Sequence, residues 1–358
     1  MIVIFLNLVL KYMLVSRKED NMNKKRLLLL LGTGLLCLTS CGRVRYEPSD
    51  YILQMNYKDD FRILQLTDTH IGDKDNTKIH YDFLDLTINE AHPDLIVITG
   101  DVFTFASKHT AKEFVKFMDD HNIPWTLTFG NHDEQCFFSI DWLTNLLNNY
   151  GHNCLFKDLQ NDDVQGNANF AINLMKDNKA FEQVIMMDSN RYYFGSYFGY
   201  DYFKQDQIDW YERLVNYTTE QNGGVVDSLM FYHIPLPEVR DAWAAAEENP
   251  ALVIKPEGTP QGGEQREEPC NPDYNSGFFD KIKALKSTKG MYFGHDHVND
   301  YLVKYEVEPG YDIHFGYGIK ATDRVYSDED LLGGRVITIG SDHSLSYQDY
   351  YHTYAEVM

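Results

Sequence analysis

Five short apolar segments are each followed directly by aspartate, asparagine or histidine, and this repeated arrangement constrains the fold more than any other feature. Apolar runs this short, bounded by polar residues or glycine, are typical of buried strands. The segments and the residues that follow them are 61–67 with Asp68-Thr69-His70, 95–99 with Gly100-Asp101, 124–129 with Gly130-Asn131-His132-Asp133, 228–232 with His233, and 291–293 with Gly294-His295-Asp296-His297. Ligands of open α/β sheets bind just beyond the carboxyl ends of the strands. The pattern therefore predicts that these side chains meet at one edge of a sheet.

The segments between the first three predicted strands have the apolar spacing of helices. We expect helices at 77–91, 110–120 and 140–150. Strands that alternate with helices of this length indicate an α/β fold with crossover connections and a largely parallel sheet.

The second half of the chain differs, because its apolar runs 170–174, 183–187 and 192–194 are separated by short polar turns, as in meandering strands. Beyond them we expect helices at 205–215 and 278–285, strands near 301–305 and 335–339, a surface loop at 250–277, and a tyrosine-rich tail that covers a sheet edge.

The residue types at the strand ends suit a transition-metal site. Carboxylate, imidazole and amide oxygen without thiolate indicate Mn, Fe, Zn or Ni rather than a cysteine-based structural zinc. Glycines precede Asp101, Asn131 and His295, and they allow the backbone to turn sharply and approach closely. A lone Asp-x-His, or one histidine after an apolar strand, is weak evidence on its own. Five such motifs, each after a predicted strand, are not explained by chance.

These motifs resemble those of the calcineurin-like metallophosphoesterase superfamily, which are Asp-x-His, Gly-Asp, Gly-Asn-His-Asp/Glu, a later His and Gly-His-x-His. The resemblance runs from about residue 62 to residue 300, and stretches 232–237, 275–280 and 294–300 are similar to the purple acid phosphatase-like branch. It implies two packed sheets flanked by helices, in a four-layer α-β-β-α arrangement, with a two-metal site.

Carried over residue by residue, the resemblance implies seven metal ligands. Asp68, His70 and His297 would bind the first metal, Asn131, His233 and His295 the second, and Asp101 would bridge the two. The purple enzymes have a metal-binding tyrosine three residues after the bridging aspartate, and this chain has Thr104 there, so no purple colour is expected. The expected cofactors are two divalent or mixed-valence transition-metal ions.

The function implied is metal-dependent hydrolysis of phosphate esters, in which hydroxide held by two metals ~3.5–4 Å apart attacks phosphorus. By the same resemblance His132 is not a ligand but lies near the leaving-group oxygen, where general-acid catalysis contributes ~10²–10⁴-fold. Asp133 and Asp296 either orient imidazoles or are solvated acids at strand ends.

Two alternatives remain open. The chain could be a surface lipoprotein that binds metal and does not catalyse, or a phosphodiesterase rather than a phosphomonoesterase, because both esterases share the seven ligands. Residues on the leaving-group side are expected from loops 190–204 and 236–275.

The charge of the chain narrows the choice of substrate. Lys and Arg number 32 and Asp and Glu 54, a formal net charge of −22. Such a surface repels long polyanions, so we expect a small phosphate ester as substrate and no nucleic-acid partner. The oligomeric state is not indicated.

The first forty residues predict export, whether translation starts at Met1 or Met22. Lys24-Lys25-Arg26 precede an apolar run, 27–38, that is shorter than the ~20 residues of a membrane-spanning helix. Leu38-Thr39-Ser40-Cys41 resembles the lipobox of bacterial lipoproteins, the alternative being a plain anchor or secretion signal. We expect a signal segment at 1–40, lipidated Cys41 and a tether at 41–57, and a single metallophosphoesterase domain at 58–358, held at the cell envelope outside the cytoplasmic membrane.

Overall fold

The computed structural model describes residues 43–73, 77–159, 162–195, 198–258 and 263–358. The predicted signal segment and Cys41 lie outside these ranges. Within them, no helix has both the length and the apolar character that crossing a bilayer requires. The chain divides into two units, and the larger one, 46–160 and 164–358, contains every sheet.

The first three predicted strands lie side by side in a five-stranded sheet. Its strands are β2 (Phe61–Leu66), β3 (Leu95–Thr99), β4 (Trp125–Thr128), β13 (Gly333–Ile339) and β14 (Leu345–Tyr351), in the order β14-β13-β2-β3-β4. The pairs β2-β3 and β3-β4 are parallel, as predicted, and β13 is antiparallel to both its neighbours. The expected tyrosine-rich tail is the edge strand β14.

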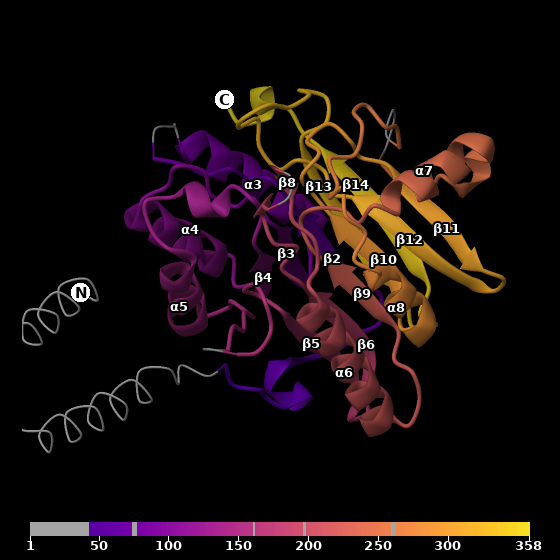
Figure 1. Ribbon diagram of the computed structural model, residues 1–358. Helices are drawn as coiled ribbons and strands as arrows, with labels where there is room; N and C mark the ends of the chain where they lie inside the picture. Colours follow the sequence, from indigo (N-terminus) through magenta and orange to yellow (C-terminus); the bar gives the residue numbers. More distant parts are fainter. Residues whose placement is uncertain (1–42, 74–76, 160–161, 196–197, 259–262) are drawn as a thin grey trace, which may run out of the picture. The chain divides into compact units, whose positions relative to one another are not determined.

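Three helices connect and cover this sheet. They are α3 (Thr77–Ala91), α4 (Lys108–Asp120) and α5 (Ile140–Tyr150), at or close to the predicted positions (Figure 1). The hydroxyls of Ser107 and Ser139 accept hydrogen bonds from the first turns of α4 and α5, so each helix begins at a serine N-cap.

The second sheet has seven strands and mixed direction. Its strands are β1 (Ile52–Asn56), β5 (Phe170–Lys176), β6 (Lys179–Met186), β9 (Ser228–Phe231), β10 (Thr288–Phe293), β11 (Leu302–Glu308) and β12 (Tyr311–Tyr317), in the order β1-β5-β6-β9-β10-β12-β11. Its helices are α6 (Gln205–Asn222), α7 (Val239–Glu248) and α8 (Phe278–Leu285). A separate hairpin consists of β7 (Tyr192–Phe194) and β8 (Phe198–Tyr200). The short 3-10 helices are η1 (Pro48–Tyr51), η2 (Asp133–Gln135), η3 (Pro250–Leu252) and η4 (Tyr354–Glu356).

Alternate residues of β9 show how the two sheets pack. Leu229 and Phe231 are buried in the core that includes the five-stranded sheet, whereas Met230 and Tyr232 are buried against α6, α7 and α8. Successive side chains of a strand point to opposite faces, so the seven-stranded sheet is covered on both sides. The predicted four-layer α-β-β-α arrangement is confirmed (Figure 1).

Some strands lie where the sequence predicts none. Residues 52–56, inside the predicted tether 41–57, form β1, which pairs in parallel with β5 at the sheet edge. The sheet therefore begins before residue 58, because the backbone groups of this short, half-exposed segment are hydrogen-bonded by a distant strand. Strands β8 and β12 were also not predicted. Helix α6 continues past residue 215 until Gly223 adopts the left-handed conformation, with φ of 77°.

Candidate metal centre

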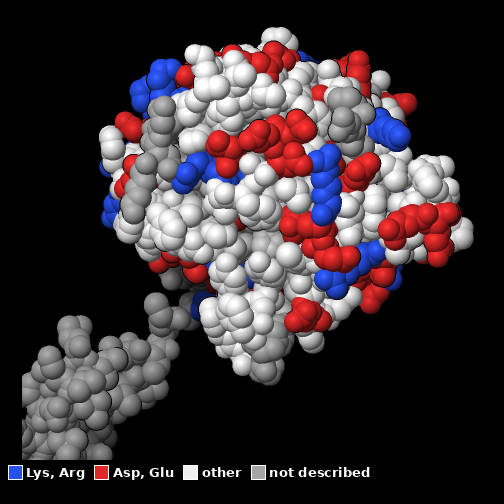
Figure 2. All heavy atoms as spheres, turned by 90° about the horizontal axis from the view of Figure 1, so that it is seen from above, with Lys and Arg blue, Asp and Glu red and all other residues white. Residues whose placement is uncertain are grey.

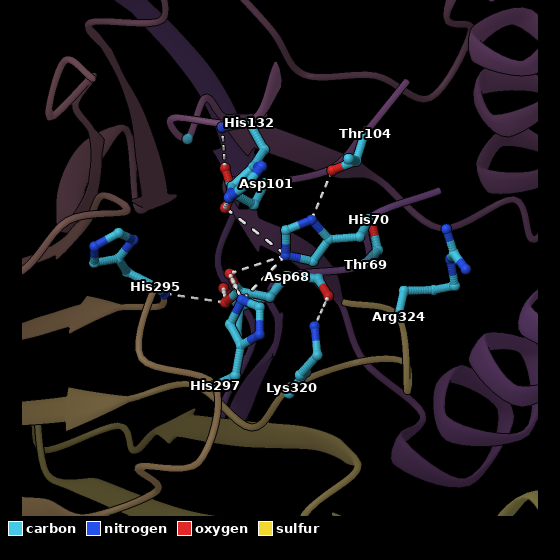
Figure 3. Close-up of polar contacts among 12 residues, drawn as sticks. Asp68, Thr69, His70, Asp101, Thr104, His132, His295, His297, Lys320 and Arg324 are labelled. Atoms are coloured by element: carbon cyan, nitrogen blue, oxygen red, sulfur yellow. Dashed lines mark hydrogen bonds and ion pairs between the residues drawn. The ribbon is translucent and has the colours of Figure 1, made fainter. Parts of the chain in front are cut away.

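Ligand atoms of four buried side chains converge beyond the ends of β2, β3 and β10. The side chains of Asp68, His70, Asp101 and His297 each offer one ligand atom, and these atoms all lie within 4.8 Å of one another (Figure 3). The Nε2 atoms of His70 and His297 are 3.1 Å apart, and His297 Nε2 is 3.2 Å from Asp68 Oδ1. The three residues predicted for the first metal thus lie together with the predicted bridging carboxylate.

A second buried group shares Asp101 with the first. Ligand atoms of Asp101, His233 and His295 also lie within 4.8 Å of one another, and His233 Nε2 is 3.3 Å from Asp101 Oδ2. One carboxylate common to two groups of histidines is the arrangement expected of a bridging ligand.

Asn131 and His132 approach Asp101 from the loop after β4. The backbone N–H of His132 donates to Asp101 Oδ1 at 2.7 Å, and the Nδ2 of buried Asn131 donates to the Tyr192 hydroxyl at 2.9 Å. Gly130 permits this approach, because a Cβ there would lie 2.2 Å from Asp101 Oδ1. All eight residues named from the sequence therefore come from the strand ends of the two sheets to this one region, and their roles remain predictions.

Three of the predicted ligand histidines, and His132, are oriented through the second ring nitrogen. The Nδ1 of His233 lies 2.7 Å from the Thr99 carbonyl oxygen, and that of His297 lies 2.8 Å from the Tyr326 carbonyl oxygen. A carbonyl oxygen only accepts, so Nδ1 carries the hydrogen and Nε2 of the neutral ring is left to bind a metal. The other two contacts are His70 Nδ1 with Thr104 Oγ1 at 2.7 Å, and His132 Nδ1 with Gln135 Oε1 at 2.9 Å.

These orienting partners were not predicted from the sequence. Thr99 and Tyr326 act through their backbone, which leaves no side-chain signal, and Gln135 could have been found only by its place three residues after His132. Thr104, which stands where the purple enzymes have a metal-binding tyrosine, positions the His70 ring instead.

Both interpretations of Asp133 and Asp296 were wrong. Asp133 is fully buried and accepts backbone N–H bonds from Phe103 and Gly130, each at 2.8 Å. Asp296 is buried and accepts from the Tyr317 hydroxyl at 2.5 Å and from the Cys270 N–H. Neither orients an imidazole and neither is solvated, because each carboxylate satisfies donors of the loops that carry the site.

Burial and mutual charge set the protonation of the central groups. Burial alone would raise the pKa of Asp101, but the neighbouring His233 outweighs it and lowers the pKa below its ordinary value. Burial, assisted by His233, lowers the pKa of His295 to about 3, and burial also lowers the pKa of His70 well below its ordinary range. Burial would lower the pKa of His233, but Asp101 outweighs it and raises that pKa to about 10. The site thus favours an ionised carboxylate beside neutral His70 and His295, whereas His233 would lose a proton on binding a metal.

Four of the seven predicted ligands have strained backbones. Asp68, His70, Asp101 and His295 have φ values of 53°, 46°, 48° and 81°, where residues other than glycine are uncommon. Such conformations cost on the order of 1–3 kcal/mol each and persist only where the surroundings enforce them. The His295 N–H donates to Asp68 Oδ2 at 3.1 Å, and buried Lys320 donates to the Asp68 carbonyl at 2.8 Å (Figure 3).

The donor atoms that a metal would need are present and unsatisfied. Among the described residues, the buried atoms without a hydrogen-bond partner include Asp68 Oδ1, Asn131 Oδ1, His233 Nε2 and His295 Nε2. Leaving a buried polar atom unsatisfied costs ~1–3 kcal/mol. Four such atoms, all on predicted ligands, fit a site that binds transition-metal ions.

The fold and the site define a metal-binding α/β protein with two adjacent ligand groups. The family model for calcineurin-like phosphoesterases matches residues 61–306, and the chain belongs to this family.

Several known proteins are similar to the chain. "Probable inactive purple acid phosphatase 14" of Arabidopsis thaliana is 28% identical over 310 residues, which cover 75% of this chain and 73% of the relative. "Phosphatase DCR2" of Saccharomyces cerevisiae is 25% identical over 287 residues, covering 72% of this chain and 47% of that protein. The crystal structure of a dimetal phosphatase from Danio rerio is 14% identical with a TM-score of 0.49, covering 83% of this chain and all of that one.

Proposed function

We propose that this protein hydrolyses small phosphate esters with two transition-metal ions. The observation that carries the proposal is the pair of buried ligand groups that share Asp101. The first ion would be held by Asp68, His70, Asp101 and His297, and the second by Asp101, Asn131, His233 and His295.

The charge of this ligand set favours a phosphate. Two bound divalent ions would supply Lewis acidity and lower the pKa of an attacking water. Asp68 and Asp101 contribute two negative charges and the other ligands are neutral, so the loaded site stays positive. Screening acts over ~8 Å at physiological salt, which allows this local charge to outweigh the overall −22. Acidic side chains are widespread on the face shown in Figure 2, which supports a small ester over a nucleic acid.

His132 is the residue that we propose protonates the leaving group. Its Nε2 lies 3.9 Å from Asp101 Oδ2, while Nδ1 is held by Gln135. Its side chain keeps 27% of its surface exposed, whereas Asp101 keeps 1%, so His132 is open to a substrate that enters from solvent. A proton on Nε2 can then pass to the ester oxygen as its bond to phosphorus breaks.

The test combines metal analysis of the full chain with its turnover of glycerol 2-phosphate, an ester with a poor leaving group. His132→Asn should retain the metals of the wild type and lose about 10²-fold or more in kcat, whereas Asp101→Asn should lose metal and activity together. His109→Asn, an exposed histidine of α4, is the matched control and should change neither. A metal-loaded protein that is inert on monoesters and diesters alike would contradict the proposal.

A non-catalytic metal-binding protein is the second candidate, because one similar protein is named "probable inactive". Retention of His132 and of all seven predicted ligands favours the enzyme. A monoesterase and a diesterase would have the same ligands, and a parallel screen of both ester classes separates them.

We further propose that the chain is exported and anchored at the outer face of the cytoplasmic membrane by a lipid on Cys41. The support is the sequence of residues 22–41 alone. Expression of the full chain should place it in the membrane fraction with an acylated N-terminal cysteine, and Cys41→Ser should release it. Equal membrane association of both forms would contradict the lipid anchor.

A further inference from the structure

An aromatic hairpin stands beside the predicted second metal. Strands β7 and β8 pair in antiparallel register, with Tyr192 opposite Tyr200 and Phe194 opposite Phe198. The side chains of Phe194 and Phe198 are 80% and 70% exposed, and their ring centroids are 5.2 Å apart. Exposed apolar groups gathered in one place mark binding surfaces more often than isolated ones do.

The rings of the hairpin form a continuous row that reaches the predicted ligands. Tyr192 stacks between Phe198 and Tyr200, with interplanar angles of 13° and 25°. At the inner end of the row, Tyr200 packs edge-on against His295 with centroids 4.4 Å apart. The Tyr192 hydroxyl also accepts the hydrogen bond from Asn131 Nδ2. The row therefore leads from two predicted metal ligands out to the two exposed phenylalanines.

Other loops next to predicted ligands also present aromatic side chains. Tyr326 stacks on His297 with centroids 4.1 Å apart and is 46% exposed. Phe105, next to the Thr104 that holds His70, is 56% exposed. The polar centre thus has an apolar rim, and the hairpin is the part of that rim with the most exposed rings.

The cations next to the hairpin are already paired. Arg191 forms an ion pair with Glu134 through Nη1, and its Nε and Nη2, which have no hydrogen-bond partner, are buried away from solvent. Lys204 forms an ion pair with Asp201 and lies over the Tyr202 ring. A second phosphate or carboxylate on the substrate would therefore find few unpaired positive charges there. Stacked ring faces attract planar, uncharged groups through dispersion and quadrupole interactions.

We propose that the β7–β8 hairpin binds the leaving group of the phosphate ester, and that the preferred substrates are esters of extended planar, uncharged alcohols such as 4-phenylphenol. The first ring of such an ester is joined to phosphorus through a single oxygen and lies next to the metal centre, where the row begins. The second ring then extends along the row toward Phe194 and Phe198. This inference rests on the proposed function and assigns Phe194 and Phe198 to substrate selectivity.

The test replaces the two exposed rings with aliphatic groups of similar bulk, in Phe194→Leu/Phe198→Leu. The variant should raise KM for 4-phenylphenyl phosphate about 5- to 20-fold and leave KM for glycerol 2-phosphate unchanged. Binding of two non-hydrolysable probes, biphenyl-4-ylphosphonate and methylphosphonate, is measured by calorimetry on the metal-loaded protein. Wild type should bind biphenyl-4-ylphosphonate more tightly, and the variant should lose most of that preference.

The controls separate this inference from the proposed function. Tyr150→Leu removes an exposed aromatic ring at the end of α5 and should change neither KM nor phosphonate binding. The wild-type protein could hydrolyse no ester and still prefer biphenyl-4-ylphosphonate, with this preference lost in the double variant. That result supports the aromatic site while the catalytic proposal fails. Equal losses for aryl and alkyl probes would overturn the inference. So would an unchanged aryl preference together with loss of lipid-vesicle binding when the double change is made in the Cys41→Ser protein, since the rings would then contact a membrane.

Discussion

The contact between His132 and Gln135 gives the sharpest test of the proposed proton transfer. Gln135 Oε1 accepts from the Nδ1 of His132 at 2.9 Å, which holds Nε2 toward Asp101 and the space for the substrate. Gln135→Met removes the acceptor with little change in length, and Gln135→Glu restores one. Gln135 would then be a positioning residue that acts through His132.

The expected losses follow from what each variant removes. A hydrogen bond between neutral groups contributes ~0.5–1.5 kcal/mol, so Gln135→Met should lower kcat by about 2- to 13-fold on an ester with a poor leaving group. His132→Asn removes the acid itself and should cost about 10²- to 10⁴-fold. Gln135→Glu should recover most of the rate lost in Gln135→Met.

The assay compares two leaving groups. Glycerol 2-phosphate needs a proton on its departing oxygen, whereas dinitrophenolate leaves without one. Both variants should therefore slow the first ester and leave kcat for 2,4-dinitrophenyl phosphate near wild type, with metal content measured alongside. Equal losses on both esters, or full activity of His132→Asn on glycerol 2-phosphate, would refute the assignment of His132 as the acid.

Four further predictions concern stability and metal binding. Burial raises the pKa of Glu182 to about 9, so the folded state retains a proton that the unfolded state releases near the ordinary pKa of a glutamate. Between about pH 6 and pH 8 the free energy of unfolding should therefore fall by up to about 1.4 kcal/mol per pH unit. Glu182→Gln should remove this slope in urea titrations. Gly130→Ala places a methyl group against Asp101, and metal content by elemental analysis should fall while the far-UV circular dichroism spectrum is retained. Arg335 is fully buried with both Asp349 oxygens bound, so Arg335→Met should lower the unfolding free energy by about 3–5 kcal/mol, and a loss below about 1 kcal/mol would contradict this. Chelation should lower the melting temperature of the purified protein, because ions at about 100 times their Kd add about 2.7 kcal/mol to stability; an unchanged melting temperature would argue against bound metals.

The strand ends could be predicted because each carries two local signals in succession. In Leu95–Thr99 followed by Gly100-Asp101, an apolar run indicates a buried strand, and the glycine and carboxylate indicate what its end presents. The parallel arrangement then brings the ends of neighbouring strands to one edge without further information. Helices α3, α4 and α5 could also be predicted, because the apolar spacing within each segment is a local signal.

The elements that were missed depend on distant partners. Strand β1 is short and half-exposed, and its pairing with β5 joins residues more than a hundred positions apart. The Thr99 carbonyl that orients His233 is a backbone atom and would be present with any residue at that position. Asp133 was misinterpreted because its donors, the N–H groups of Phe103 and Gly130, are fixed by the loop conformation and not by residue type.

The hydrogen bond from the His295 N–H to Asp68 Oδ2 joins loops of the two sheets at the metal centre. Because the predicted ligands run from Asp68 to His297, a nascent chain cannot assemble either complete ligand group until nearly all of it has been synthesised. If these ligands bind the proposed ions, metal acquisition would be a late maturation step. A fragment released by a protease cut between the sheets would then have to reassociate before it could retain its ions.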